Sequence, residues 1–505
     1  MSLTPQAALA ELNQKTRTIS HLYSCASLLG WDERTHMPPK GGLHRAEQLA
    51  LLAGMAHERT VDPRIGELLD AVRNSSLVAD PYGDATVIVR EVSRTYERAA
   101  KMPQSLVEEI TRTASLGQTA WEEARAKSEY AIFKPWLAKM LDLKKQEAEA
   151  VGYQDDPYNA LLDDYEPGAT VATAETILTQ LRAELVGLLD KIRGSSRRPN
   201  LNILDRPYPV DRQKDFGRLC SEAIGFDYQQ GRLDITVHPF CTGIGPGDTR
   251  ITTRYDDKNL AYALFSTLHE SGHGIYDQGL DPRQFGTPLG ESISLGIHES
   301  QSRMWENMVG RSRAFWVHFF PKAQRAFPEA LGTVTLDDFY FVINDVRPSF
   351  IRTEADEATY NLHILLRFEL ERAIFSGNLS VDELPAVWNE KFKASFGLTP
   401  SKDSEGCLQD VHWSCGYIGY FPTYSLGNLY AAQFFAQARL DLGDLDAMFA
   451  RGDFAPLKEW LRTRIHSQGR RYRAADLVQR VTGKPLSPAP LMCYMNAKFG
   501  ALYGF

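Results

Sequence analysis

The residues best suited to chemistry lie in the segment LFSTLHESGHGIYDQG, which contains the pattern H-E-x-x-H at His269, Glu270 and His273. On a helix, side chains four residues apart lie on one face with Cβ atoms roughly 5–6 Å apart, so both imidazoles can reach one metal ion. Glu270 follows the first histidine and would reach a water molecule at the ion without binding the ion itself. The pattern therefore predicts a metal site that activates water.

The alternative interpretation of this pattern is a chance match on a helix surface. The preceding residues 262–265 (YALF) are mostly apolar, which indicates a buried helix. Gly272 and Gly274 each cost about 1 kcal/mol of helix stability relative to alanine. They also permit close approach by a ligand or by a neighbouring backbone. We therefore expect a buried helix that carries the metal ligands.

A catalytic zinc site usually has three protein ligands and one position open for water. Gly279 stands where the longer pattern H-E-x-x-H-x-x-G-x-x-H would supply a third histidine, so this ligand must come from another segment. Glu299 follows His273 by 26 residues, and a turn and one helix would bring it back beside the histidines. Glu291 and Glu306 are alternatives in the same segment, and helical geometry does not choose among the three.

Most of the chain has apolar residues at helical spacing. The clearest predicted helices are 4–29, 43–58, 87–100, 106–126, 130–150 and 175–192. Helical spacing also continues through 259–396, where 337–376 is expected to form one long helix bent near Pro348, and it returns after 427. The segment 195–210 contains three prolines and is predicted to be a loop.

Spacing of two replaces helical spacing only between 232 and 255, where LDITV and TRITTRY flank a glycine-rich segment. This pattern predicts a β-hairpin or small ribbon with a long turn. No domain boundary is evident. The sequence thus predicts one mainly α-helical domain over 1–505, with an N-terminal helical part at about 1–200 and a metal-site part at about 230–430.

Composition excludes several classes of protein. The 505 residues are 43% hydrophobic and 24% charged, as in ordinary globular proteins. A net charge of −8 argues against nucleic acid as a partner. No apolar run approaches the roughly 18 residues of a membrane span, and no secretory signal is evident, so we expect a cytoplasmic protein without a membrane partner. The six cysteines include no C-x-x-C pair and are expected to be free thiols.

Five further motifs accompany H-E-x-x-H. They are HPF at 238–240, DTRIT at 248–252, HESQ at 298–301, IRTEAD at 351–356 and GCLQDVHW at 406–413. In this combination and order, the chain resembles the carboxypeptidase Taq family of metallocarboxypeptidases. WDE at 31–33 and GYFPTY at 419–424 extend the resemblance over most of the chain.

The resemblance implies a large helical domain with a deep substrate groove, similar to angiotensin-converting-enzyme-like peptidases. It also implies release of C-terminal residues from peptides, a zinc or cobalt ion, and a homodimer. Carried over by position, His269, His273 and Glu299 would bind the metal and Glu270 would be catalytic. We expect one divalent ion per chain, zinc first, because a His₂Glu site also accepts cobalt or manganese.

An enzyme that acts at peptide C-termini needs a cation for the terminal carboxylate, and the planar arginine fork suits this task. Arg352 and Arg250, the latter with Asp248 beside it, are the candidates for substrate binding. Each has a structural alternative, because Arg250 can pair with Asp248 and Arg352 with Asp356 four residues on. His238 is held extended by the proline that follows it, and it would either face the groove or pack as a structural histidine.

The remaining motif residues suggest supporting roles. Side chains that can hydrogen-bond the tetrahedral oxyanion are His412, Tyr420 and Tyr424. Asp410 or Asp356 would orient a ligand imidazole, and His298 is also expected in the surroundings of the metal ligands.

The sequence therefore predicts a metal-dependent carboxypeptidase that acts on peptides with a free C-terminus. The first alternative is a zinc endopeptidase or a dipeptidyl carboxypeptidase built on the same core. The second is a non-catalytic helical binding protein that keeps zinc as a structural element. Side-chain preference, native metal and dimer interface are not readable from these patterns.

Overall fold

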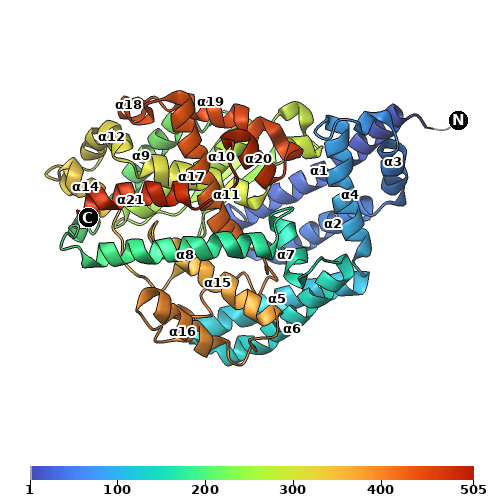
Figure 1. The fold of residues 1–505 in the computed structure, drawn as a ribbon, viewed down its shortest axis with the longest axis horizontal. Helices are drawn as coiled ribbons and strands as arrows, with labels where there is room; N and C mark the ends of the chain where they lie inside the picture. Colours follow the sequence, from blue (N-terminus) through green and yellow to red (C-terminus); the bar gives the residue numbers. More distant parts are fainter. Residues whose placement is uncertain (1–2) are drawn as a thin grey trace. The chain divides into compact units, whose positions relative to one another are not determined.

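The computed structural model describes residues 3–505, and helices dominate it (Figure 1). The chain forms two compact units, each assembled from three segments. Unit 1 comprises the residues up to Ala100 together with Pro199–Ile343 and Tyr430–Leu486. Unit 2 comprises Lys101–Arg198, Asn344–Leu429 and Ser487–Phe505. Neither unit coincides with the predicted parts 1–200 and 230–430, and the single domain over 1–505 stays a prediction.

Unit 1 begins with a helical bundle that has its own apolar core. Ala8 and Leu12 of the first helix pack with Leu68 and Val72 of the third and with Val87 of the fourth. The helices of this unit are α1 (Pro5–Thr35), α2 (Gly42–Thr60), α3 (Pro63–Arg73), α4 (Asp84–Lys101), α9 (Val210–Ile224), α10 (Leu260–Gly279), α11 (Leu295–Arg303), α12 (Arg313–Ala326), α13 (Pro328–Leu331), α14 (Leu336–Val342), α18 (Leu445–Ala450), α19 (Ala455–Arg464) and α20 (Ala474–Thr482). The residues of α17 (Pro422–Leu442) from Tyr430 onward also belong here.

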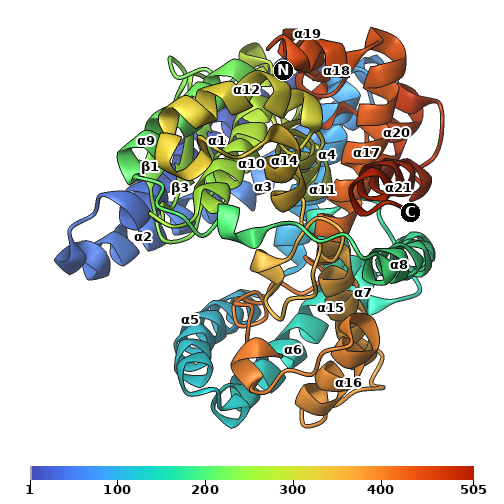
Figure 2. The same cartoon turned by 90° about the vertical axis from the view of Figure 1, so that its left-hand side faces the viewer.

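The predicted ribbon is a three-stranded sheet in the order β1-β3-β2, beside α9 and α10 (Figure 2). β1 (Gly231–Ile235) is parallel to β3 (Asp248–Thr253), and β2 (Cys241–Gly245) is antiparallel to β3. The prediction that the two flanking segments form a hairpin was wrong. The glycine-rich segment is itself a strand, and the tight turn at Gly247, with φ of 82°, pairs it with β3.

Helix α10 carries the H-E-x-x-H pattern and is buried, as predicted. The Asn259 side chain caps its first turn by accepting a hydrogen bond from the Tyr262 amide. Leu264 and Leu268 are almost fully buried, and the helix packs on β3, α9 and α11. A Cβ atom at Gly272 would lie 2.6 Å from Ser302 Cα, and one at Gly274 would lie 2.5 Å from the Phe226 ring. The predicted close approach by a neighbouring backbone is therefore confirmed at Gly272, whereas at Gly274 the close neighbour is a side chain.

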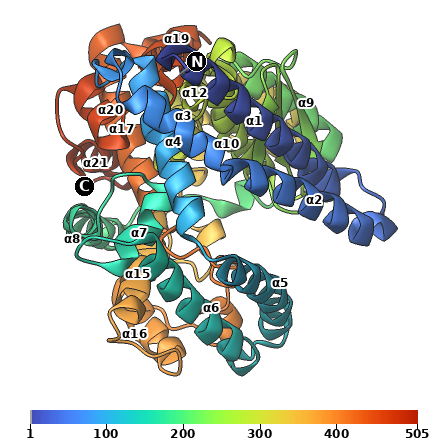
Figure 3. The ribbon, with the colours of Figure 1, turned by 90° about the vertical axis from the view of Figure 1, so that its right-hand side faces the viewer.

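Unit 2 is also helical, and its long helices α5 and α6 lie side by side (Figures 1 and 3). Its helices are α5 (Gln104–Lys127), α6 (Tyr130–Val151), α7 (Pro157–Tyr165), α8 (Val171–Gly194), α15 (Tyr360–Phe375), α16 (Leu384–Phe396), α21 (Ala489–Tyr503) and the first two turns of α17. No helix within 3–505 combines the length and apolar character of a membrane span. The six cysteines are free thiols, as predicted.

The long helix predicted over 337–376 was wrong. α14 ends at Val342 and α15 begins at Tyr360, and the short helical turn η7 (Arg352–Glu354) lies between them. Pro348 cannot donate a helical hydrogen bond. Asp356 instead binds the backbone N–H groups of Arg347, Ala358 and Thr359, which fixes this segment as a loop before α15. Arg352 therefore lies outside any long helix.

Candidate metal centre

Three of the predicted ligands converge in unit 1. The Nε2 atoms of His269 and His273 lie 3.6 and 3.3 Å from Glu299 Oε2. One ligand atom from each of the three residues fits within 4.8 Å of the other two. Helix α10 supplies both imidazoles from one face, and α11 supplies the carboxylate, because the two helices pack closely at Gly272.

Each histidine is held at the ring nitrogen that faces away from Glu299. His269 Nδ1 lies 2.9 Å from Glu306 Oε2, and His273 Nδ1 lies 2.5 Å from His298 Nδ1. His298 Nε2 in turn lies 2.9 Å from Asp277 Oδ1. A proton on His273 Nδ1 and another on His298 Nε2 satisfy both contacts. When both rings are neutral, as metal binding requires, the Nε2 lone pairs of His269 and His273 are directed to the space beside Glu299.

Glu299 is buried and ionised. Its Oε1 accepts from Arg303 Nε at 2.8 Å, and its Oε2 accepts from Ser302 Oγ at 3.0 Å. Burial alone would raise the pKa of Glu299, but Arg303 and then His269 hold it well below its usual value. The pKa of Glu306 falls to about 2 for similar reasons, since Arg303 and His269 outweigh the effect of burial. Both carboxylates are therefore available to a cation at pH 7.

Glu270 lies beside the three ligands and makes none of these contacts. Its side chain is buried, with 7% of the residue exposed. Burial raises its pKa to about 7, against the opposing charge of His269. A carboxyl group with a pKa near neutrality can both accept and donate a proton, which general acid–base catalysis requires. The predicted catalytic residue therefore has chemistry that suits its role.

The residues present fit a divalent metal ion. Two imidazole nitrogens and one carboxylate oxygen form the donor set of many catalytic zinc sites. Their outer partners, Glu306, His298 and Asp277, are of the types that orient such ligands. Of the alternative third ligands, Glu306 contacts Nδ1 of His269, the ring nitrogen that faces away from Glu299, and Glu291 pairs with Arg470 at 3.1 Å. This geometry favours Glu299.

In unit 2, the structure brings together most of the predicted substrate residues. Arg352 Nε donates to Asp410 Oδ1 at 2.9 Å, and its Nη1 donates to Tyr360 Oη at 3.0 Å. Its partner is therefore Asp410, and the helical pair with Asp356 does not form. The Arg352 guanidinium also lies 5.1 Å from the centre of the Tyr424 ring.

His412, Tyr420 and Tyr424 adjoin this arginine. His412 Nε2 lies 3.3 Å from Tyr424 Oη, and the Tyr420 and Tyr424 rings meet edge to face at 5.3 Å. Burial, followed by the charge of Arg352, lowers the pKa of His412 to about 3. His412 is therefore a neutral imidazole at pH 7 and can donate one hydrogen bond.

Other predicted site residues make local contacts. Arg250 forms two hydrogen bonds to Asp248, at 2.9 and 2.8 Å, and stacks 4.2 Å from the Trp31 ring. This is the ion pair expected as its structural alternative. His238 is exposed in the loop between β1 and β2. Asp356 caps the loop before α15, and Asp410 binds arginines, so the groups that contact the ligand imidazoles are Glu306 and His298.

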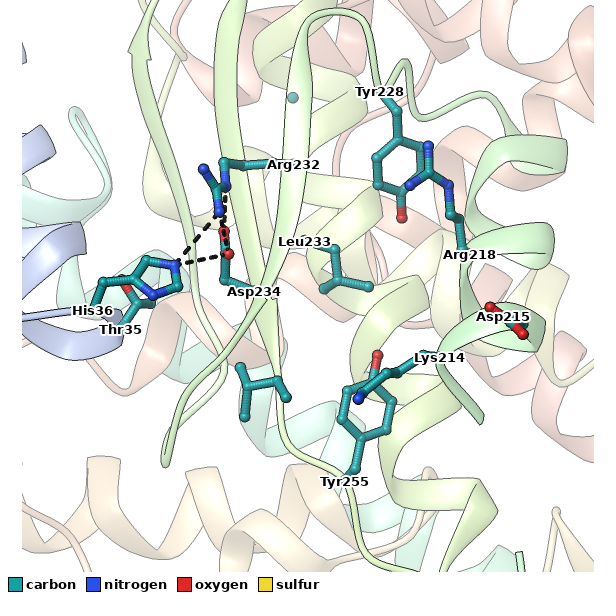
Figure 4. Close-up of a pocket in the computed structure, with 12 residues that line it drawn as sticks. Thr35, His36, Lys214, Asp215, Arg218, Tyr228, Arg232, Leu233, Asp234 and Tyr255 are labelled. Carbon is teal, nitrogen blue, oxygen red and sulfur yellow. Dashed lines mark hydrogen bonds and ion pairs between the residues drawn. The ribbon is translucent and has the colours of Figure 1, made fainter. Parts of the chain in front are cut away.

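A separate cavity of about 710 Å³ lies in unit 1 between β1 and α9 (Figure 4). Arg232 and His36 both bind Asp234 there, at 2.6 and 3.1 Å. The cations on α9 are also paired, Lys214 with Asp211 and Arg218 with Glu222. None of the predicted metal or substrate residues is among those that line it. We assign no catalytic role to this cavity.

The sequence patterns did not reveal Asp277 or Arg367, and they indicated Glu306 only as an alternative third ligand and not as the partner of His269 Nδ1. Glu306 follows α11 in a π-helical turn (Met304–Gly310), whose extra residue per turn changes which side chains share a face. Asp277 follows His273 by four residues on α10, so the shared helix face was a usable signal. Arg367 binds Asp410 from α15, and no local pattern connects these two residues.

Known proteins identify the family. A family model described as carboxypeptidase Taq (M32) metallopeptidase matches residues 11–499. Thermostable carboxypeptidase 1 of Thermus thermophilus is 49% identical, with 99% of this chain and 100% of that protein covered. Carboxypeptidase 1 of Bacillus subtilis is 40% identical, with 96% and 97% covered. The crystal structure of the M32 carboxypeptidase from Deinococcus radiodurans superposes with a TM-score of 0.96 at 39% identity, covering 99% of this chain and 100% of that one. The chain therefore belongs to the carboxypeptidase Taq (M32) family of metallopeptidases and is a metal-dependent carboxypeptidase.

Proposed function

We propose that the chain releases single amino acids from the free C-terminus of peptides, with Glu270 as general base and acid. The observation that carries this proposal is the convergence of His269, His273 and Glu299 beside Glu270. A divalent ion held by the three ligands would supply Lewis acidity at the scissile carbonyl and lower the pKa of a water molecule. Glu270 takes a proton from the attacking water and passes it to the leaving amine.

Two further groups act on the substrate in this proposal. Arg352 recognises the terminal carboxylate, because its guanidinium can donate two parallel hydrogen bonds. Arg250 is less suited to bind the terminal carboxylate, since its Nε and Nη2 already donate to Asp248. Side chains proposed to hydrogen-bond the tetrahedral oxyanion are His412, Tyr420 and Tyr424.

A matched pair of peptides tests the direction of cleavage. The two peptides share one sequence and end either in a free carboxylate or in an amide, and released amino acids are quantified. We expect the free acid to be cleaved and the amide to be cleaved at least about tenfold more slowly, because Arg352 loses its carboxylate partner. Equal cleavage of both would indicate an endopeptidase, and release of dipeptides would indicate a dipeptidyl carboxypeptidase. A chelator should abolish activity, and added zinc should restore it.

The variant Glu270→Gln tests the role of the general base. It should lower kcat by about 10²–10⁴-fold while metal content stays unchanged, since Glu270 is not a ligand. Glu291→Gln is the matched control, because Glu291 pairs with Arg470 away from the ligands, and it should retain wild-type turnover. Full activity of Glu270→Gln with metal bound would exclude the proposed mechanism.

We further propose zinc as the native ion, a homodimer in solution and a cytoplasmic location. The His₂Glu donor set supports zinc, although it also accepts cobalt or manganese. The dimer and the location, like the substrate groove, rest on the resemblance and on sequence composition. Metal analysis of protein purified without added metal, together with sedimentation, tests the first two.

A further inference from the structure

Unit 2 contains a buried cluster in which two arginines share one carboxylate. Arg352 Nε binds Asp410 Oδ1 at 2.9 Å, whereas Arg367 places Nε and Nη2 at 2.6 and 2.5 Å from Oδ2. The exposed fractions of the three side chains are 8% for Arg352, 0% for Arg367 and 12% for Asp410. Each carboxylate oxygen therefore serves one arginine.

The neighbouring ionisable groups do not balance the second positive charge. The adjacent imidazoles of His363 and His412 are neutral at pH 7, because burial and then an adjacent arginine lower the pKa of each. Glu371 is the other nearby acid, but its oxygens accept hydrogen bonds from Tyr158, Trp413 and the Gly419 amide. Burial also raises the pKa of Glu371 to about 7, so it is only partly ionised.

The two arginines differ in their remaining donor capacity. Arg367 Nη1 donates to the His363 carbonyl at 2.7 Å, and its guanidinium lies 4.9 Å from the Trp388 ring. It is fully buried, so a peptide cannot reach it. Arg352 donates from Nη1 to Tyr360, and no hydrogen bond from its Nη2 is found within residues 3–505. Arg352 is thus the arginine whose Nη2 can donate a hydrogen bond to a substrate.

We propose that Arg367 is a positioning residue for recognition of the substrate carboxylate: by binding Asp410 Oδ2 it prevents Asp410 from neutralising Arg352. This inference rests on the proposed role of Arg352 at the peptide C-terminus. A lone Arg352–Asp410 pair would be electrically neutral and would attract a second carboxylate weakly. With Arg367 present, the cluster retains one uncompensated charge in a region of low dielectric constant, where Coulomb attraction is strong. A bound terminal carboxylate would bring the cluster to two arginines and two carboxylates. The cluster would then be electrically neutral, and the cost of an unpaired buried charge would be removed.

Arg367→Met removes this charge while keeping much of the side-chain volume. We expect KM for a free-acid peptide to rise about 10- to 100-fold, which is the loss of affinity expected when one charge-assisted hydrogen bond is lost. kcat and metal content should change by less than about threefold, because the metal ligands are untouched. The preference for the free acid over the amide should fall by the same factor as KM rises. Arg367→Lys keeps the charge and should hold KM within about fivefold of wild type.

The double variant Arg367→Met/Asp410→Asn separates charge balance from structure. It restores one net positive charge on Arg352, so its KM should fall back towards the wild-type value. If Arg367 served only to hold the fold, losing two partners would make the double variant as poor as the single one or worse, and the proposal would be overturned. If Arg367→Met alone does not fold, the KM values of Arg367→Lys and of the double variant decide the question in the same way.

Arg352→Met distinguishes failure of this inference from failure of the proposed function. An unchanged KM in Arg352→Met would mean that Arg352 does not recognise the carboxylate. A raised KM in Arg352→Met with an unchanged KM in Arg367→Met would leave that recognition intact and refute only the role of Arg367.

Discussion

Replacing Gly272 by alanine should weaken metal binding without touching any ligand. Gly272 lies between Glu270 and His273 on α10, where α11 comes closest. An added Cβ would lie 2.6 Å from Ser302 Cα, 2.7 Å from the Gln301 carbonyl oxygen and 2.9 Å from the Ser302 amide nitrogen. All three are backbone atoms, so rotation of a side chain cannot relieve the overlap. The two helices must move apart.

The size of this movement follows from ordinary contact distances. Carbon atoms in contact are separated by about 3.5–4.0 Å, so α10 and α11 must separate by roughly 1 Å at this point. Ser302 also donates to Glu299 Oε2 at 3.0 Å, so the shift acts directly on the third proposed ligand. Metal–ligand distances tolerate only about 0.2 Å. We therefore expect the metal dissociation constant to rise at least about tenfold, as when an outer partner of a ligand is lost.

The stability of the metal-free protein should fall by no more than about 2 kcal/mol. Overpacking costs about 1–3 kcal/mol, whereas replacing a helical glycine by alanine recovers about 1 kcal/mol. Chelator competition measures metal affinity, and denaturant unfolding of the chelated protein measures stability. Gly187→Ala in α8 is the matched control, because no atom lies within 4 Å of the added Cβ. It should stabilise the protein by up to about 1 kcal/mol and leave metal affinity unchanged. Wild-type metal affinity in Gly272→Ala would refute the reasoning.

Two further predictions concern buried glutamates. Glu306→Gln keeps an acceptor for His269 Nδ1 but loses its charge, so metal affinity should fall about 10-fold in chelator competition; an unchanged affinity would make Glu306 dispensable for orienting His269. Burial raises the pKa of Glu371 from 4.5 to about 7, so the unfolded chain loses this proton at lower pH than the folded chain does. The stability that Glu371 contributes below pH 4.5 is therefore lost as pH rises towards 7, by on the order of 3 kcal/mol. The unfolding free energy of wild type minus that of Glu371→Gln should fall over this window, and a flat difference would contradict the assignment.

Features encoded by local sequence were predictable. The helical segments 130–150 and 175–192 appear within α6 and α8, because regular apolar spacing and nearby caps act over a few residues. The proposed ligands His269 and His273 share a helix face for the same reason. The choice of Glu299 over Glu306 needed the family resemblance, since both follow α10 at distances that a turn and a helix can span.

Features that depend on distant partners were not predictable. Arg352 pairs with Asp410, 58 residues away, and the local alternative Asp356 is occupied by backbone N–H groups. The sheet order also depends on pairing across the chain, and the glycine-rich β2 lacks the apolar alternation that reveals a strand. Arg367 was not predictable because its proposed role depends on the charge balance of a buried cluster, which no local sequence pattern indicates.

The metal centre and the arginine cluster differ in how their buried charges are balanced before a ligand binds. Around the histidines, Glu299 and Glu306 face the guanidiniums of Arg303 and Arg311. Although burial opposes it, the charge of Glu299 raises the pKa of His269 to about 9, so this imidazole carries a further positive charge, while Glu270, with a pKa of about 7, is only partly ionised. A metal ion at Nε2 of His269 would displace that proton, so metal binding should release a proton. In unit 2, two guanidiniums face one carboxylate, and an uncompensated buried charge destabilises a fold until a ligand of opposite charge binds. The arginine cluster therefore lowers the stability of the free protein, and binding of a carboxylate would regain that free energy.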